Sequence, residues 1–161
     1  MNTPKELLSH AVVHALLAQE KTLCTAESCT GGLIAKLITD VPGSSAVFPG
    51  GAVTYTNEIK MQLLGVSAQS IAHHTEVSHT VAAEMARGAR ARFGSDYALS
   101  TTGYAGPGGG TPEDPVGTVY IGLSTPTAER TVRLCCPPDA DRAQVREHAA
   151  AYALQMLLDI L

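Results

Sequence analysis

The hydrophobic positions near the start of the chain follow the period of an α-helix. Leu8, Val12 and Leu16 recur at four-residue intervals within residues 4–20. Because side chains three or four positions apart share one face of a helix, this spacing predicts a helix with one buried face. The preceding sequence TPKE predicts its start, since Thr3 is a suitable cap and Glu6, three positions later, completes a capping box.

Five further segments have the composition of β-strands, because they are short, rich in small and β-branched residues and bounded by turn-forming sequences. They are TLCTA (22–26), GAVTYT (51–56), DYALSTT (96–102), VGTVYIGLS (116–124) and ERTVRLCC (129–136). Only the tetrapeptide TPTA separates the last two segments. That short connection predicts an antiparallel hairpin.

Helical segments separate most of these strands. We expect helices over 27–40, over 57–65 with Asn57 as cap, over 78–93 with Ser78 as cap, and from Asp139 or Asp141 to Ile160. Strands that alternate with helices predict a three-layer α/β/α sandwich. The hairpin makes its five-stranded sheet mixed, although we expect it to be mostly parallel. No repeat or linker divides the sequence, so a single domain is expected over residues 1–161.

Composition excludes several classes of partner. A net charge of −4 provides no basic surface for nucleic acid. No apolar run approaches the roughly 20 residues that span a bilayer, so no membrane contact is expected. The four cysteines include no CxxC pair. We therefore interpret them as reduced thiols, which indicates a cytoplasmic protein.

The stretch AESCTGG (26–32) leads from a predicted strand into a predicted helix. Exposed N–H groups at a helix start bind anions, so Ser28, Cys29 and Thr30 lie where a phosphate or carboxylate would be held. The simpler interpretation is that Ser28 only caps the helix. The stretch is neither a Walker loop nor a GxGxxG motif, and Cys29 has no sequence partner that would activate it as a nucleophile.

A second candidate lies in VPGSSAVF (41–48), which begins like a nucleophile elbow but lacks the final glycine. A serine needs a base to become a nucleophile, and Tyr55 and Lys60 follow Ser45 within fifteen residues. Such a unit could bring the three side chains together, but spacings of this kind also arise by chance.

Two other features are compatible with ligand binding. The glycine-rich loop GYAGPGGG (103–110) follows a predicted strand, where ligand crevices form in α/β sheets, although a surface connection would look the same. His10 and His14 are four residues apart on a predicted helix, as a metal pair would be. No third ligand is evident, so no metal site is expected.

Eight segments in a fixed order resemble the CinA C-terminal domain family, the competence/damage-inducible domain that includes nicotinamide mononucleotide deamidases. They are TAESCTGG, PGSSAVF, VTYTNEIK, LLGV, VSHTVAAEMARGA, AGPGGG, PVGTVY and DRAQVREHAAAYAL, between about residues 22 and 155. The resemblance implies a stand-alone deamidase of pyridine nucleotide salvage. It would hydrolyse the carboxamide of nicotinamide mononucleotide to nicotinate mononucleotide and ammonia. It also implies no cofactor and a homo-oligomer, at least a dimer.

The same resemblance implies the site residues. Ser45 would be the nucleophile, with Tyr55 and Lys60 as its activating partners. The nucleotide would be bound by Ser28, Cys29, Thr30, Gly31, Thr102, Gly103 and Arg142. The family's usual GIAGP is GYAGP here, so Tyr104 adds bulk at the crevice. Two alternatives stay open, namely a catalytically silent nucleotide-binding module and an amidase for another amide.

Overall fold

The computed structural model describes residues 4–161, so the predicted cap Thr3 lies outside the described residues. The strands are β1 (Leu23–Glu27), β2 (Gly50–Val53), β3 (Tyr97–Gly103), β4 (Thr118–Ser124) and β5 (Glu129–Cys135). The helices are α1 (Pro4–Gln19), α2 (Leu33–Thr39), the 3-10 turn η1 (Ser44–Ala46), α3 (Asn57–Leu64), α4 (Ala68–His74), α5 (His79–Phe93) and α6 (Arg142–Leu158).

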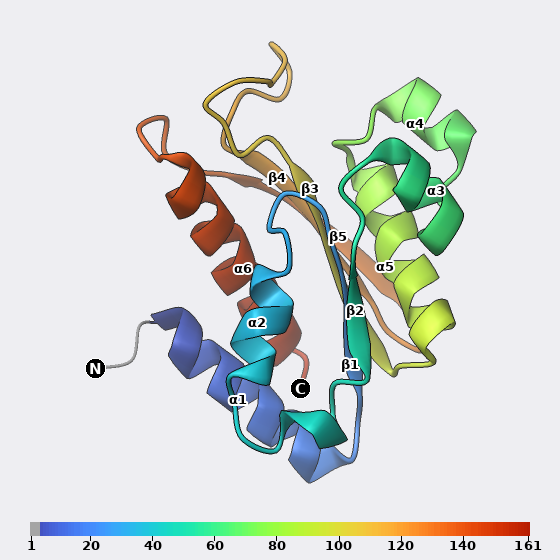
Figure 1. Cartoon of the computed structure of the whole chain (residues 1–161), viewed down its shortest axis with the longest axis vertical. Helices are drawn as coiled ribbons and strands as arrows, with labels where there is room; N and C mark the ends of the chain where they lie inside the picture. The colour runs from blue at the N-terminus through green and yellow to red at the C-terminus, as the bar shows by residue number, and fades with distance from the viewer. Residues whose placement is uncertain (1–3) are drawn as a thin grey trace.

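One five-stranded sheet forms the middle layer, in the order β2-β1-β3-β4-β5. Helices α1, α2 and α6 cover one face and α3, α4 and α5 lie on the other, which confirms the three-layer α/β/α sandwich (Figure 1). β1 is parallel to β2 and β3, whereas β4 is antiparallel to β3 and β5. The mixed sheet is thus confirmed. Its pairings are evenly divided rather than mostly parallel, because β4 pairs antiparallel on both of its sides.

Hydrophobic residues pack on both faces of the sheet. The largest cluster packs α1, α2 and α6 against the sheet, and it includes Val12, Leu16 and Leu154. A smaller cluster packs α5 against β1 and β3. A Cβ atom at Gly88 of α5 would lie 1.9 Å from the Leu64 carbonyl oxygen. Only glycine therefore allows the end of α3, the helix that carries Lys60, to pack so closely on α5.

The apolar C-terminal helix α6 is buried within its own chain. Its buried residues are Val145, Ala149, Ala150, Ala153, Leu154, Met156 and Leu157, and it packs mainly on α1. Its composition is therefore explained without a second subunit, and the expected homo-oligomer stays a prediction. Among residues 4–161, no helix is both long and apolar enough to cross a membrane.

Several element boundaries differ from the sequence predictions. The second helix begins at Leu33 rather than near Glu27, and Gly32 precedes it without a side-chain cap. Thr56, not Asn57, caps α3. Helix α4 was not predicted, because none of its residues is buried and its sequence therefore carries no apolar period. The cap at Ser78 is confirmed.

Candidate active site

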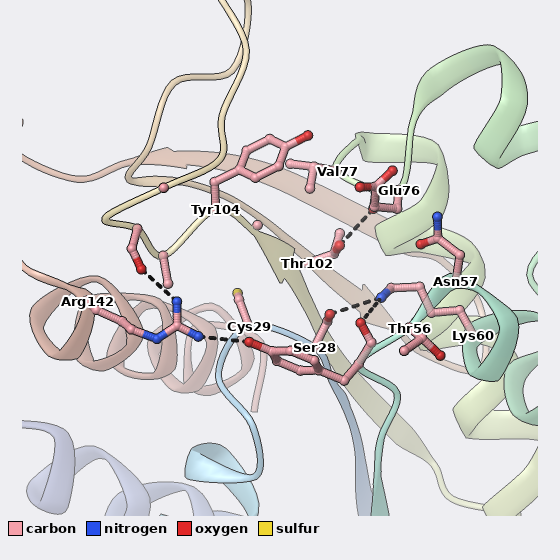
Figure 2. Close-up of a pocket in the computed structure, with 15 residues that line it drawn as sticks. Ser28, Cys29, Thr56, Asn57, Lys60, Glu76, Val77, Thr102, Tyr104 and Arg142 are labelled. Atoms are coloured by element: carbon pink, nitrogen blue, oxygen red, sulfur yellow. Dashed lines mark hydrogen bonds between the residues drawn. The ribbon is translucent and has the colours of Figure 1, made fainter.

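A single edge of the sheet gathers most of the predicted site residues. The carboxyl ends of the parallel strands β1, β2 and β3 meet there. Ligands of open α/β sheets bind at the carboxyl ends of the strands. A pocket with a cavity volume of about 390 Å³ opens at this edge (Figure 2). It is lined by residues 28–29, 55–57, 60, 76–77, 102–106, 108 and 142. This volume lies within the range of small-molecule sites.

Ser28 is the first residue after β1 and is held by the neighbouring strand. Its backbone N–H donates to the Thr101 carbonyl oxygen over 3.0 Å, which continues the β1–β3 pairing by one residue. The chain then turns through Gly31 and Gly32, both with positive φ, a conformation that glycine adopts without strain. Ser28 is 8% exposed, so its hydroxyl lies at the pocket wall in a fixed environment.

The buried Glu27 carboxylate holds the turn between β1 and α2 in place. It is 1% exposed and accepts hydrogen bonds from the Thr30 hydroxyl at 2.6 Å, the Ile34 N–H at 2.9 Å and the Ala35 N–H at 3.0 Å. The anion at the start of α2 is therefore the protein's own carboxylate. This corrects the expectation that the helix start holds a ligand anion. Thr30 is buried beside Thr101, and neither Thr30 nor Gly31 lines the pocket.

Lys60 is a fully buried lysine whose amino group faces Ser28. Its Nζ lies 2.9 Å from Ser28 Oγ, 2.9 Å from the Thr54 carbonyl oxygen and 3.4 Å from the Tyr55 carbonyl oxygen (Figure 2). Burial lowers the pKa of Lys60 below its ordinary 10.5, although the Glu76 carboxylate and the Cys29 thiol act in the opposite direction. With two N–H groups held by carbonyls, a neutral amine would direct its lone pair at the Ser28 hydroxyl.

Ser45 lies at the opposite end of the sheet from Lys60. It is exposed in η1, and the carbonyl of Val47 accepts from the N–H of Leu23, the first residue of β1. Ser28 follows the last residue of β1. The five residues of that strand separate the two serines by roughly 16 Å at about 3.3 Å per residue. The predicted Ser45–Lys60 pair is therefore wrong, and the serine beside Lys60 is Ser28.

Arg142 closes the pocket on the side away from Lys60. Its guanidinium donates to the Gly106 carbonyl oxygen at 2.7 Å and to the Tyr55 hydroxyl at 2.8 Å (Figure 2). It is the first residue of α6, directly after the cap Asp141. The Tyr55 side chain is 57% exposed. Arg142 thus links three elements distant in sequence, namely α6, the glycine-rich loop and the segment after β2.

The remaining predicted binding residues also line the pocket. The Thr102 hydroxyl donates to the Glu76 carbonyl oxygen at 2.7 Å, which joins β3 to the segment before α5. Gly103 follows it, where a Cβ would lie 2.5 Å from the Thr118 carbonyl oxygen. Burial raises the pKa of Cys29 to about 12. Its thiol is therefore neutral near pH 7 and unsuited to act as a nucleophile.

Sequence reasoning missed four pocket residues, Thr56, Asn57, Glu76 and Val77. Thr56 and Asn57 follow Tyr55 after the carboxyl end of β2, so the strand-end rule could have found them. Glu76 and Val77 precede the cap of α5 and carry no comparable signal. Within the described residues no group of three His, Cys, Asp or Glu side chains could hold a metal ion, and His10 and His14 form no such group.

Comparison with known proteins identifies relatives across almost the whole chain. The protein-family model of the CinA C-terminal domain matches residues 5–161 of the chain. The Escherichia coli K12 protein named nicotinamide-nucleotide amidohydrolase PncC is 51% identical over 150 residues, covering 93% of this chain and 90% of that protein. A CinA-like protein of Myxococcus xanthus is 52% identical over 153 residues, but the chain spans only 36% of its length.

Solved structures agree with the sequence relatives. The crystal structure of the competence/damage inducible protein CihA from Agrobacterium tumefaciens has a TM-score of 0.95 and 36% identity, covering 99% of this chain and 97% of that one. A CinA superfamily protein from Escherichia coli has a TM-score of 0.93 and 37% identity, covering 98% of this chain and 90% of the other. The chain belongs to the CinA C-terminal domain family.

Proposed function

We propose that this chain hydrolyses the carboxamide of nicotinamide mononucleotide, giving nicotinate mononucleotide and ammonia. The 2.9 Å contact between Lys60 Nζ and Ser28 Oγ carries the proposal, because it pairs a hydroxyl with a buried amine in a pocket of suitable size. The Escherichia coli K12 relative, of which the chain covers 90%, is named nicotinamide-nucleotide amidohydrolase, and this name supports the proposed substrate. The reaction belongs to pyridine nucleotide salvage, so we propose a cytoplasmic enzyme.

Ser28 is the proposed nucleophile and Lys60 its general base. Neutral Lys60 takes the hydroxyl proton as Ser28 Oγ attacks the carboxamide carbon, and a tetrahedral intermediate forms. Protonated Lys60 then gives that proton to the carboxamide nitrogen, which leaves as ammonia. The product of this half-reaction is an ester between Ser28 and the nicotinoyl group.

Water then hydrolyses the Ser28 ester, again with Lys60 as the general base. Lys60 takes a proton from the water that attacks the ester carbon, and Ser28 regains its proton as the carboxylate product leaves. The oxygen of each tetrahedral intermediate needs N–H donors. The backbone N–H of Cys29, a residue that lines the pocket, follows the nucleophile directly and donates to no backbone carbonyl among residues 4–161. We propose it as one of these donors.

Arg142 is the proposed partner of the phosphate. Its guanidinium is on the side of the pocket away from Lys60, so a bound nucleotide would place the phosphate and the carboxamide at opposite ends (Figure 2). Two parallel N–H donors suit a phosphate. In the free protein these donors are held by Tyr55 and Gly106, and the phosphate would compete with both. Tyr55 is therefore proposed as a residue that positions Arg142.

Ammonia release from nicotinamide mononucleotide tests the proposal. The purified chain would be incubated with the nucleotide, with nicotinamide, with nicotinamide riboside and with asparagine, and ammonia would be measured. The proposal predicts turnover of the nucleotide in clear preference to the others. No ammonia from any of them would favour a silent nucleotide-binding module. Release only from one of the other amides would favour a different amidase.

A further inference from the structure

Glu76 places a carboxylate in the pocket that is engaged by no hydrogen bond or ion pair in the described structure. The residue lies between α4 and α5, and its backbone carbonyl accepts the Thr102 hydroxyl, which fixes its position. No hydrogen bond or ion pair of its carboxylate is formed within residues 4–161. Every other ionisable side chain that lines the pocket is a tyrosine, a cysteine, a lysine or an arginine. Glu76 is thus the sole acidic side chain among the described lining residues.

The charged groups of the pocket are separated in space. Arg142 lies on one side, whereas Glu76 and Lys60 lie together on the other (Figure 2). The Glu76 carboxylate is close enough to Lys60 to raise the pKa of that amine, against the larger and opposite effect of burial. When Lys60 is neutral, as a general base must be, a negative charge remains at the end of the pocket where Ser28 would act.

This distribution matches the charges of the proposed substrate. The ring nitrogen of nicotinamide mononucleotide carries the glycosidic bond, so the ring is a pyridinium cation, while the phosphate is an anion. A carboxamide within reach of Ser28 brings its ring to the end of the pocket that holds Glu76. The phosphate then lies toward Arg142. A ligand with positive and negative ends would therefore be oriented by the two sides of the pocket.

We propose that Glu76 is a specificity-determining residue that recognises the positive charge of the substrate ring and selects cationic carboxamides over neutral ones. This inference rests on the proposed function. The ring of Tyr104 also lines the pocket, and the Glu76 carboxylate contributes, after burial, to raising the pKa of its hydroxyl. An aromatic face beside a carboxylate is a favourable setting for a planar cation.

A matched pair of ligands isolates the ring charge. Nicotinamide mononucleotide and its reduced dihydro form share the carboxamide, ribose and phosphate, but the reduced ring is neutral. Dissociation constants for both would be measured by calorimetry in a Ser28→Ala background, which prevents turnover. We expect the oxidised form to bind roughly ten- to hundredfold more tightly, as a charge-assisted contact would give. Glu76→Gln should remove most of that preference and leave the affinity for the reduced form nearly unchanged.

Two further variants complete the test. Glu76→Asp, which keeps the charge, should retain part of the preference, and Glu58→Gln, an exposed glutamate on α3 outside the pocket, should retain all of it. Equal loss of affinity for both ligands in Glu76→Gln, or an unchanged preference, would overturn the inference. Failure of the wild-type chain to release ammonia would instead overturn the proposed function, and the binding preference would still report on Glu76.

Discussion

The Lys60 amino nitrogen and the Ser28 hydroxyl oxygen lie 2.9 Å apart, although 32 positions separate the two residues. Lys60 lies on the first turn of α3, and Ser28 directly follows β1. Their strands are parallel neighbours, so both chain segments leave the sheet at the same edge. The contact therefore follows from the topology of the sheet.

Lys60→Arg separates the role of a base from that of a cation. A guanidinium keeps the positive charge but does not deprotonate in proteins, so it cannot accept the Ser28 proton. We expect kcat to fall by the ~10²–10⁴ typical of a lost general base, while calorimetry shows nucleotide binding near wild type. Lys36→Arg, an exposed substitution on α2, is the control and should leave kcat unchanged. A folded Lys60→Arg protein within a few-fold of wild-type kcat would exclude Lys60 as the base.

The pH profile should report the neutral form of Lys60. Burial lowers the pKa of this amine below 10.5, and the active form is the one without the proton. The value of kcat/KM should therefore rise with pH through a Lys60 pKa that lies below 10.5, and level off above that pKa. The groups nearest the amine are the Ser28 hydroxyl and the Thr54 and Tyr55 carbonyls. The Glu76 carboxylate and the Cys29 thiol also act on its pKa.

Glu76→Gln should move that profile to lower pH, because it removes a carboxylate that raises the Lys60 pKa. Profiles of wild type and variant measured in the same buffers check the sign. A shift to higher pH would mean that the group titrating in the profile is not Lys60.

Arg142→Ala should weaken nucleotide binding. A charge-assisted contact between a guanidinium and a phosphate is worth ~1.5–3 kcal/mol, which corresponds to a roughly ten- to hundredfold rise in KM. Steady-state kinetics on nicotinamide mononucleotide would measure it, with Arg92→Ala, exposed on α5, as the matched control. Because Arg142 also donates to the Tyr55 hydroxyl, a smaller fall in kcat is expected as well. An unchanged KM would place the phosphate elsewhere in the pocket.

Glu27→Gln should destabilise the fold although Glu27 does not line the pocket. An amide cannot accept with both of its ends, so at least one of the hydrogen bonds from Thr30, Ile34 and Ala35 is lost in a buried site. We expect the free energy of unfolding in urea to fall by about 1.5–3 kcal/mol. Glu147→Gln removes an exposed carboxylate beside Lys5 and should cost less than ~1 kcal/mol. Equal effects of the two substitutions would contradict this role of Glu27.

Most of the fold was predictable because its signals are local. Apolar periods, caps such as Ser78 and the short connection before β5 each depend on residues close in sequence. The helix after β1 was misplaced for the opposite reason. The Glu27 carboxylate that satisfies its first N–H groups lies seven and eight residues before its partners Ile34 and Ala35, a distance at which no capping rule operates.

The predicted pairing of Ser45 with Lys60 fails because closeness in sequence does not ensure closeness in space. Ser45 precedes Tyr55 by only ten residues, but β2 runs between them and carries the chain from one end of the sheet to the other. Ser28 and Lys60 are far apart in sequence yet follow the carboxyl ends of adjacent parallel strands. The strand-end rule, applied to the serine after β1, would have selected Ser28. Glu76 has no such signal, because its place depends on the packing of the segment before α5 against β3.

The assignment of Ser28 as the nucleophile is tested most directly by measuring kcat for ammonia release with Ser28→Ala and Ser45→Ala side by side. Both substitutions remove one hydroxyl and no other atom group, and Ser45 is exposed in η1. Circular dichroism would check that both proteins are folded. We predict that Ser28→Ala loses kcat by roughly 10³-fold or more, as removal of a covalent nucleophile does, and that Ser45→Ala stays within twofold of wild type. A folded Ser28→Ala protein that keeps its kcat, or a Ser45→Ala protein that loses it, would contradict the assignment.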